Sequence, residues 1–307
     1  MKYVIGMDGG GTKTEVRVAD ADKNILLSFR AGAINYNGSE KQAIDSNIRD
    51  IFQRIIWEGF ETGNCAAICI GAAGISNPRV KEQIMEQVTG AGHRCPVSIV
   101  GDIETAYAAA LENGPGIILI AGTGSICFGK DDIGKTYRMG GYGPIIGDEG
   151  SGYALAADIL SAVVKAQDGR GKPTILTKLV FDYLKIGSLA ELIEYLYRPG
   201  RNKREIAELS QLIVPAYDQG DETAILILNK CASDLADLAI PMLAKMNGLS
   251  RLAVSGSILI RNKAIFHEFE AKVKAAFPET TIIEPCHDAA YGAVVLALQL
   301  GRRQQII

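Results

Sequence analysis

Two glycine-rich turns, each next to short apolar segments, constrain the fold of this 307-residue chain more than any other feature. The first is Asp8-Gly9-Gly10-Gly11, between segments 3–8 and 12–19. The second is Gly122-Thr123-Gly124-Ser125, which follows the apolar segment 116–121. Glycine between two such segments is typical of hairpin turns, because it adopts backbone conformations that other residues avoid. We therefore predict a β-hairpin at each turn.

The elements around the first turn have an order that the second half of the chain repeats. The first half is expected to contain strands at 3–8, 12–19, 24–30, 66–70 and 97–100, with helices from about Ser39, from Pro78 and over 104–112. The second half is expected to contain strands at 116–121, 126–129, 135–139, 252–255 and 282–284, with helices at 151–167, 262–276 and 288–300. Each half therefore has the order βββαβαβα, and a helical stretch at about 172–248 is inserted into the second. The repeat predicts an α/β protein of two similar domains around a cleft.

Helix starts support these boundaries. Ser39 and Gln42 are spaced as a capping box, and Asn77 before Pro78 is a typical helix start. Asp288 is expected to cap the last helix.

Composition excludes several classes of protein. Thirty-two basic residues against 35 acidic ones give a net charge of -3, which argues against nucleic acid as the main partner. The short apolar start is not typical of a signal peptide, and no apolar run is long enough to span a membrane. The six cysteines do not suggest a disulfide framework, and no CxxC or HxxxH pair predicts zinc. We therefore expect a cytoplasmic protein.

The two glycine turns also suit phosphate, because glycine lets backbone N–H groups approach an anion closely. Thr12, Thr123 and Ser125 would add hydroxyl donors, although both turns could instead be hairpins without a ligand. Gly124 to Lys130 fits the start of a Walker A loop, but Asp131 follows where Ser or Thr is needed. No G-x-G-x-x-G lies between a strand and a helix, which disfavours a Rossmann unit.

Acidic residues follow predicted strands and turns. Asp102 lies just after a strand, where it could accept a proton from a hydroxyl or cap the next helix. Asp8 could hold magnesium through water or simply form an Asp-Gly turn. Asp148 and Glu149 lie just before a helix, where acids are ordinary. Asn35 could bind a polar ligand or shape a loop.

Three motifs in order resemble one known family. They are Asp8-Gly9-Gly10-Gly11-Thr12-Lys13-Thr14, then Ala121-Gly122-Thr123-Gly124-Ser125, then Gly140-Gly141-Tyr142-Gly143 with Gly147-Asp148-Glu149-Gly150-Ser151. Together they resemble the N-acetylglucosamine kinase branch of the BadF/BadG/BcrA/BcrD ATPase family, within the actin-like and hexokinase-like ATPases. The resemblance spans nearly the whole chain.

The resemblance implies two actin-like, ribonuclease H-like domains, at 1–113 with a returning last helix at about 289–307, and at 114–288. It implies ATP- and Mg²⁺-dependent phosphorylation of the 6-hydroxyl of an N-acetylated amino sugar. In that reaction Asp102 would be the general base, and Asp8 would hold magnesium through water. It also implies a homodimer. The implied ATP contacts are Gly10, Gly11, Thr12, Lys13, Gly122, Thr123, Gly124, Gly256 and Ser257. The implied sugar contacts are Asn35, Tyr36, Asp102, Ser125, Gly141, Tyr142, Gly143 and Asp148, with Tyr142 standing where family kinases often have Trp.

Alternatives remain open at this stage. A related activator ATPase of a radical-type dehydratase would carry an iron–sulfur cluster on paired cysteines and a different second phosphate turn, and Cys127 is the cysteine closest to that turn here. Another actin-like phosphotransferase, or a kinase for glucosamine or glucose, would share the motifs. A repressor-type sugar sensor would need a DNA-binding segment, and only two residues precede the first predicted strand.

Overall fold

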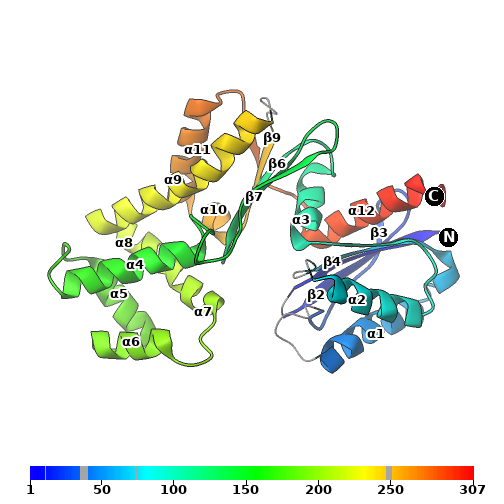
Figure 1. The fold of residues 1–307 in the computed structure, drawn as a ribbon, viewed down its shortest axis with the longest axis horizontal. Helices are drawn as coiled ribbons and strands as arrows, with labels where there is room; N and C mark the ends of the chain where they lie inside the picture. Colours follow the sequence, from blue (N-terminus) through cyan, green and yellow to red (C-terminus); the bar gives the residue numbers. More distant parts are fainter. Residues whose placement is uncertain (11, 35–40, 73–74, 76, 247–250) are drawn as a thin grey trace. The chain divides into compact units, whose positions relative to one another are not determined.

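The structure is a computed structural model that describes residues 1–10, 12–34, 41–72, 75, 77–246 and 251–307. Its chain divides into two compact units (Figure 1). The first unit comprises Met1–Gly114 and Pro285–Ile307, and the second comprises Pro115–Glu284.

The first unit is built on a five-stranded mixed sheet in the order β3-β2-β1-β4-β5. Its strands are β1 (Tyr3–Gly9), β2 (Thr14–Ala19), β3 (Ile25–Ala31), β4 (Cys65–Ala72) and β5 (Val97–Val100). Its helices are α1 (Lys41–Trp57), α2 (Pro78–Gly90), α3 (Asp102–Leu111) and α12 (Ala289–Arg303), with a short 3-10 turn at Thr62–Asn64. The first three strands are antiparallel, whereas β4 and β5 run parallel to β1.

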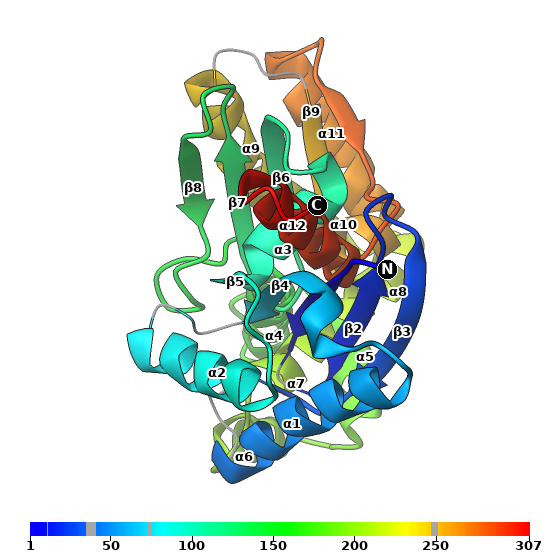
Figure 2. The same ribbon diagram turned by 90° about the vertical axis from the view of Figure 1, so that its right-hand side faces the viewer.

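Helices cover both faces of this sheet because side chains on β1 alternate between its faces. Ile5 and Met7 pack in one apolar cluster with α1 and α2, which lie side by side in Figure 2. Val4 faces the other way and packs with residues of α12. The last helix of the chain thus packs on the first sheet.

Close packing of α12 depends on a glycine. A Cβ on Gly292 would overlap the backbone of Thr105 in α3, so any larger residue would push the two helices apart. Asp288 caps α12, since its side chain accepts a hydrogen bond from the Tyr291 N–H, as predicted.

The second unit repeats the topology of the first. Its five-stranded sheet has the order β10-β9-β6-β7-β8. Taken from β8 to β10, this order corresponds strand for strand to β3-β2-β1-β4-β5 of the first sheet. Its strands are β6 (Gly116–Ala121), β7 (Ser125–Lys130), β8 (Thr136–Gly140), β9 (Arg251–Ser255) and β10 (Thr281–Ile283). Its helices outside the insertion are α4 (Gly152–Gln167), α10 (Ser257–Arg261) and α11 (Lys263–Ala276). The predicted α/β fold with a duplicated strand order and a hairpin at each glycine turn is confirmed.

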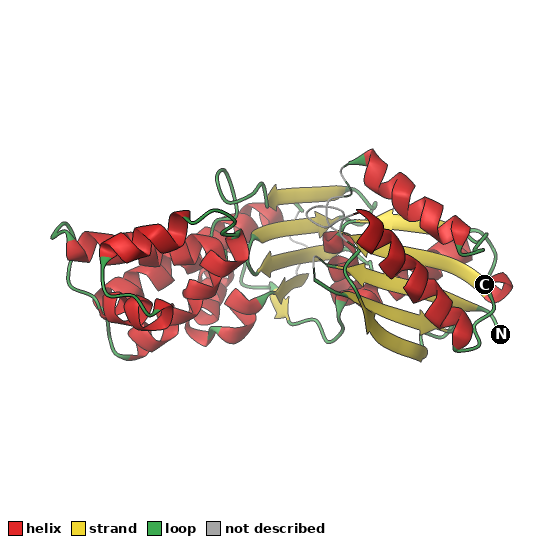
Figure 3. Cartoon of the chain, turned by 90° about the horizontal axis from the view of Figure 1, so that it is seen from below, coloured by secondary structure: helices red, strands yellow, loops and turns green. Residues whose placement is uncertain are grey.

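The segment between α4 and β9 is helical, and Figure 3 shows a group of helices that contains no strand. The elements are α5 (Ile175–Leu184), α6 (Leu189–Tyr197), α7 (Lys203–Ala207), a 3-10 turn (Glu208–Leu212), α8 (Ile213–Asp218) and α9 (Glu222–Lys245). Side chains of Thr174, Ser188, Asn202 and Asp221 cap four of these helices. Leu228 and Leu235 of α9 are buried in the core of the unit, where α9 packs on β6, β7 and α11.

Some predicted boundaries shift by a few residues. Strand β2 begins at Thr14 rather than residue 12, because the Gly10 N–H bonds the Lys13 carbonyl at 2.9 Å and closes the turn there. Helix α3 begins at Asp102 rather than residue 104. The Asn77 cap is confirmed, whereas the predicted Ser39 cap lies outside the described residues. None of the helices described is long and apolar enough to cross a membrane.

Candidate functional site

Asp8 and Asp102 come from neighbouring strands at one edge of the first sheet. Asp8 is the penultimate residue of β1 and pairs with Gly71 of β4, which pairs in turn with Val100 of β5. Asp102 follows β5 by two residues and begins α3. Because β1, β4 and β5 are parallel, their carboxyl ends meet at this edge, where ligands of open α/β sheets bind.

The environment of Asp8 disfavours its charged form. Burial, and then the negative charge of Asp102, raise the pKa of Asp8 to about 6. Asp288 and Glu15 add to this effect, whereas Lys13 opposes it. A half-buried carboxylate surrounded by other acids is a position that a cation would stabilise.

Asp102 is exposed, and its Oδ1 accepts the Ile103 N–H at 3.0 Å. Gly101 occupies the N-cap position, so the Asp102 carboxylate lies in the first turn of α3. A carboxylate there is favoured by the helix dipole and keeps its second oxygen available to solvent or a ligand.

The first glycine turn has mostly exposed side chains. Gly10 takes part in the bond that closes the turn, and Thr12 is exposed. Lys13 is paired with Glu15 at 2.8 Å. Gly11, Asn35 and Tyr36, which the sequence also singled out, lie outside the described residues.

The second glycine turn is tied to the start of α4. The Gly152 N–H bonds the Gly122 carbonyl at 2.7 Å, and the Tyr153 N–H bonds the Thr123 carbonyl at 3.3 Å. A further bond from Gly122 N to Gly124 O, at 2.8 Å, closes the turn itself. The turn therefore has a defined conformation, and the Thr123 side chain remains exposed.

A pocket of about 580 Å³ opens beside this turn. It is lined by glycines, hydroxyl and amide side chains, two arginines, one glutamate and two apolar residues: Gly122, Thr123, Gly152, Arg204, Ala207, Glu208, Ser210, Gln211, Ser257, Ile258, Arg261 and Asn262. The structure thus brings Thr123 together with Ser257, although the two are far apart in the sequence. Arg261 and Arg204 add positive charge that the sequence did not indicate, and Arg204 lies 3.9 Å from Glu208 of the same lining.

Gly256 shapes the same pocket. Its φ of +91° lies in the region that favours glycine, and a Cβ there would overlap the backbone of Ala121 at the end of β6. Strand β9 can therefore turn into α10 directly beside the second glycine turn.

Asp148 is nearly buried and forms an ion pair with Lys203 of α7. The pair lies against the second glycine turn, because a Cβ on Gly124 would lie 3.1 Å from Lys203 Nζ and 3.2 Å from the Asp148 carboxylate. Asn202 and Glu205 form a capping box that the sequence analysis did not use. That box could have indicated the start of α7, but not that Lys203 contacts Asp148.

The remaining predicted sugar contacts lie near Asp148. Ser125 is buried, and its hydroxyl donates to the Glu149 carbonyl at 2.6 Å, so its proton is already used within the protein. Gly141 and Gly143 have φ of +75° and +95°. Tyr142 is 60% exposed, and the Arg138 guanidinium lies 4.9 Å from its ring centre. An acidic pocket of about 420 Å³ is lined by Gly140, Tyr142, Ile146, Gly147, Glu149, Asp234, Asp237 and Leu238.

Two sheets of matching strand order, each with a glycine hairpin turn, are the fold of actin-like ATPases and sugar kinases. The chain belongs to the BadF/BadG/BcrA/BcrD ATPase family, whose match covers residues 5–297.

Named relatives of this chain are sugar kinases. N-acetylmuramic acid/N-acetylglucosamine kinase of Clostridium acetobutylicum is 37% identical, over 97% of this chain and 98% of that protein. N-acetyl-D-glucosamine kinase of Dictyostelium discoideum is 31% identical, over 96% of this chain and 97% of that protein. Glucosamine kinase GspK of Vibrio cholerae is 27% identical, over 97% and 96%.

Solved structures share the fold. A candidate N-acetylglucosamine kinase from Chromobacterium violaceum has a TM-score of 0.77 and 26% identity, over 96% of this chain and 99% of that one. A ROK family glucokinase from Streptomyces griseus, solved with glucose and AMPPNP, has a TM-score of 0.54 and 16% identity, over 98% and 99%.

Proposed function

We propose that this chain is an ATP-dependent kinase that transfers a phosphoryl group to the 6-hydroxyl of an N-acetylated amino sugar. The observation that carries the proposal is the 37% identity, across almost the whole of both chains, to a protein named N-acetylmuramic acid/N-acetylglucosamine kinase. The two glycine turns, the pocket beside the second turn and the exposed Asp102 carboxylate supply groups that this reaction needs.

Asp102 is proposed to act as general base. Its exposed carboxylate can accept the proton of the sugar hydroxyl as that oxygen attacks the γ-phosphorus of ATP. The hydroxyl oxygen forms a bond to phosphorus, the bond to the ADP oxygen breaks, and the proton goes to Asp102. The position of Asp102 at the carboxyl end of β5 supports this role.

Asp8 is proposed to hold magnesium, most simply through bound water. Its raised pKa, caused by burial and by Asp102, fits a carboxylate whose charge a cation would balance. Magnesium bound with ATP neutralises the phosphate oxygens and stabilises the charge that develops in phosphoryl transfer. Asp8 would thus hold the magnesium ion next to the first glycine turn.

The pocket beside the second glycine turn is proposed to bind ATP. Thr123 and Ser257 offer hydroxyl groups, and Arg204 and Arg261 offer positive charge for phosphate oxygens. Gly122 lines the pocket and has open space where a Cβ would stand, whereas Gly124 and Gly256 are proposed to contribute through the turns that they form. Gly10, Gly11, Thr12 and Lys13 of the first glycine turn are likewise proposed to bind ATP.

Asp148 and Tyr142 are proposed to contact the sugar together with Asn35 and Tyr36. The Asp148 carboxylate is oriented by Lys203, which would leave it one fixed direction in which to accept a sugar hydroxyl. Ser125 would then support the Asp148 loop through its bond to Glu149 rather than touch the sugar by its proton.

The test is an ADP-release assay with ATP·Mg²⁺ and four sugars: N-acetylglucosamine, N-acetylmuramic acid, glucosamine and glucose, with a blank that contains no sugar. We expect release that depends on an N-acetylated sugar, and a product whose phosphorus-31 and carbon-13 NMR spectra place the phosphate on C6. Faster turnover of glucosamine, as the name of the Vibrio cholerae relative suggests, would move the substrate to the unacetylated sugar. ADP release that does not depend on any sugar would overturn the kinase proposal.

A further inference from the structure

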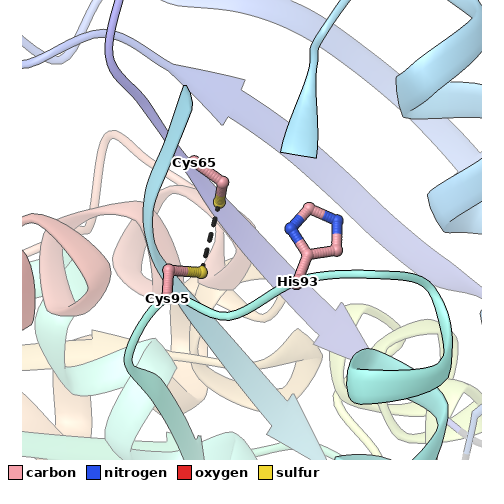
Figure 4. Close-up of side chains that lie close together, drawn as sticks. All are labelled: Cys65, His93 and Cys95. Atoms are coloured by element: carbon pink, nitrogen blue, oxygen red, sulfur yellow. Dashed lines mark hydrogen bonds between the residues drawn. The ribbon is translucent and has the colours of Figure 1, made fainter. Parts of the chain in front are cut away.

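Three side chains with metal-binding atoms lie together in the first unit, in a place that the proposed reaction does not use. Figure 4 shows Cys65, His93 and Cys95 pointing toward one another. Cys65 is the first residue of β4, and the other two lie between α2 and β5. The two sulfur atoms are 3.6 Å apart, and the three donor atoms all lie within 4.8 Å of one another.

His93 is buried, and its ring nitrogens have no hydrogen-bond partner. Its side chain is 3% exposed, and neither Nδ1 nor Nε2 has a hydrogen-bond partner. Phe52 covers it with a ring centre 4.9 Å away. Leaving a buried polar group unpaired is costly, so few such groups occur in native proteins. A bound metal ion would reduce this cost by taking one of the two ring nitrogens as a ligand.

The Cys95 thiol donates a hydrogen bond to the Cys65 sulfur, and this spacing of the two sulfur atoms also suits a shared metal ion, but not a disulfide. Tetrahedral zinc with Zn–S bonds of about 2.3 Å places two thiolates roughly 3.8 Å apart. A disulfide would bring the same atoms to about 2.05 Å. Two cysteines and one histidine are also a ligand set that suits zinc, because thiolate and imidazole are its preferred ligands.

We propose that Cys65, His93 and Cys95 bind one zinc ion, with water as the fourth ligand. Cys95 is only partly buried, so solvent can reach the fourth position. Among the residues that the structure describes, these three form the one group of His, Cys, Asp or Glu side chains with such close donor atoms.

The position of the cluster separates the ion from the proposed catalytic acids. Cys65 pairs with Tyr3 at the amino end of β1, whereas Asp8 pairs with Gly71 at the carboxyl end. The six residue steps from Cys65 to Gly71 span roughly 20 Å of extended strand. The ion would therefore not reach Asp8. It would instead fasten the segment before β5 to β4, beside the hydrogen bond from Ile68 N to Pro96 O at 3.0 Å.

The experiment measures metal directly. The full chain is purified without chelator and incubated with one equivalent of zinc. Desalting then removes loosely held metal, and zinc is counted by mass spectrometry. We expect about one zinc per chain in the wild type and in the control Cys286→Ser, which removes the exposed cysteine. Cys95→Ser and His93→Gln are expected to retain at least tenfold less, as loss of one ligand implies.

A second arm does not depend on the folding of any variant. Cobalt added to the metal-free wild type is expected to produce thiolate-to-cobalt absorption that zinc abolishes. Removing zinc with a chelator is expected to lower the melting temperature by roughly 5–10 °C, with recovery when zinc is returned. Wild type that neither retains zinc nor gives the cobalt absorption would overturn the proposal. So would a Cys65–Cys95 disulfide, seen as the loss of two hydrogens in the intact mass and as one linked peptide.

Discussion

Asp8 and Asp102 lie at the same edge of the first sheet, where burial, and after it the negative charge of Asp102, raise the pKa of the Asp8 carboxylate. Asp8 is thereby kept in an environment that costs stability unless a cation is present. Such a cost is ordinary for groups that bind ligands, since the arrangement that suits the ligand is strained without it.

The pH dependence of stability should reveal Asp8 in the absence of magnesium. Its pKa rises from 3.8 to about 6 on folding, so between these values the native state holds more protons than the unfolded state. The free energy of unfolding should therefore fall as pH rises from about 4 to 6, by about 3 kcal/mol at most. Asp8→Asn removes the charge, so its melting temperature should exceed that of the wild type at pH 7 and match it near pH 4. If the difference in melting temperature between Asp8→Asn and the wild type is the same at pH 4 and pH 7, the raised pKa of Asp8 would be contradicted.

Replacing the proposed base should impair chemistry more than binding. Asp102→Asn is expected to lower kcat by about 10²–10⁴-fold, with little change in the KM for the sugar. Asp50→Asn, on the exposed surface of α1, is the matched control and should keep normal turnover. Steady-state ADP release measures both constants. Turnover of Asp102→Asn within a few-fold of the wild type would exclude it as the base.

The Asp148–Lys203 ion pair should stabilise the folded protein, because the Asp148 carboxylate is nearly buried. Lys203→Met leaves Asp148 without its partner, which we expect to cost about 1–3 kcal/mol, the lysine itself being partly exposed. Lys172→Met breaks a pair with Glu222 in which both side chains are largely exposed, and should cost less than about 0.5 kcal/mol. Urea unfolding of the two variants compares them directly, and equal losses would contradict this interpretation.

Gly256 should be intolerant of a side chain, whereas Gly220 should be tolerant. Both have positive φ, but a Cβ on Gly256 would overlap Ala121 and one on Gly220 would meet nothing within 4 Å. Gly220→Ala should therefore cost only the backbone strain, about 1 kcal/mol. Gly256→Ala should cost more and raise the KM for ATP, because the strand-to-helix turn lines the proposed ATP pocket. Equal ATP affinity in the two variants would argue against ATP in that pocket.

Local features of this protein were predictable because they depend on neighbours in the sequence. Glycine turns predicted both hairpins, and the repeated order of apolar segments predicted the shared topology of the two sheets. Asn77 and Asp288 were recognisable as helix caps, since a cap bonds to a residue two or three positions away. The sequence placed Asp8 and Asp102 at the ends of two strands, and the parallel pairing of β1, β4 and β5 in the structure sets them at one edge.

The tertiary structure alone decided the contacts between distant segments. Nothing in the spacing of Asp148 and Lys203 indicates an ion pair, because the packing of the helical insertion sets where α7 meets the glycine turn. The contact between Cys65 and Cys95 was likewise not predictable. Their spacing in the sequence matches no zinc-binding motif, so the sequence argued against a zinc site. Their sulfur atoms meet because parallel pairing sets the amino ends of β4 and β5 side by side. Sequence patterns report on short-range geometry, and a site assembled across strands and helices depends on how the whole unit packs.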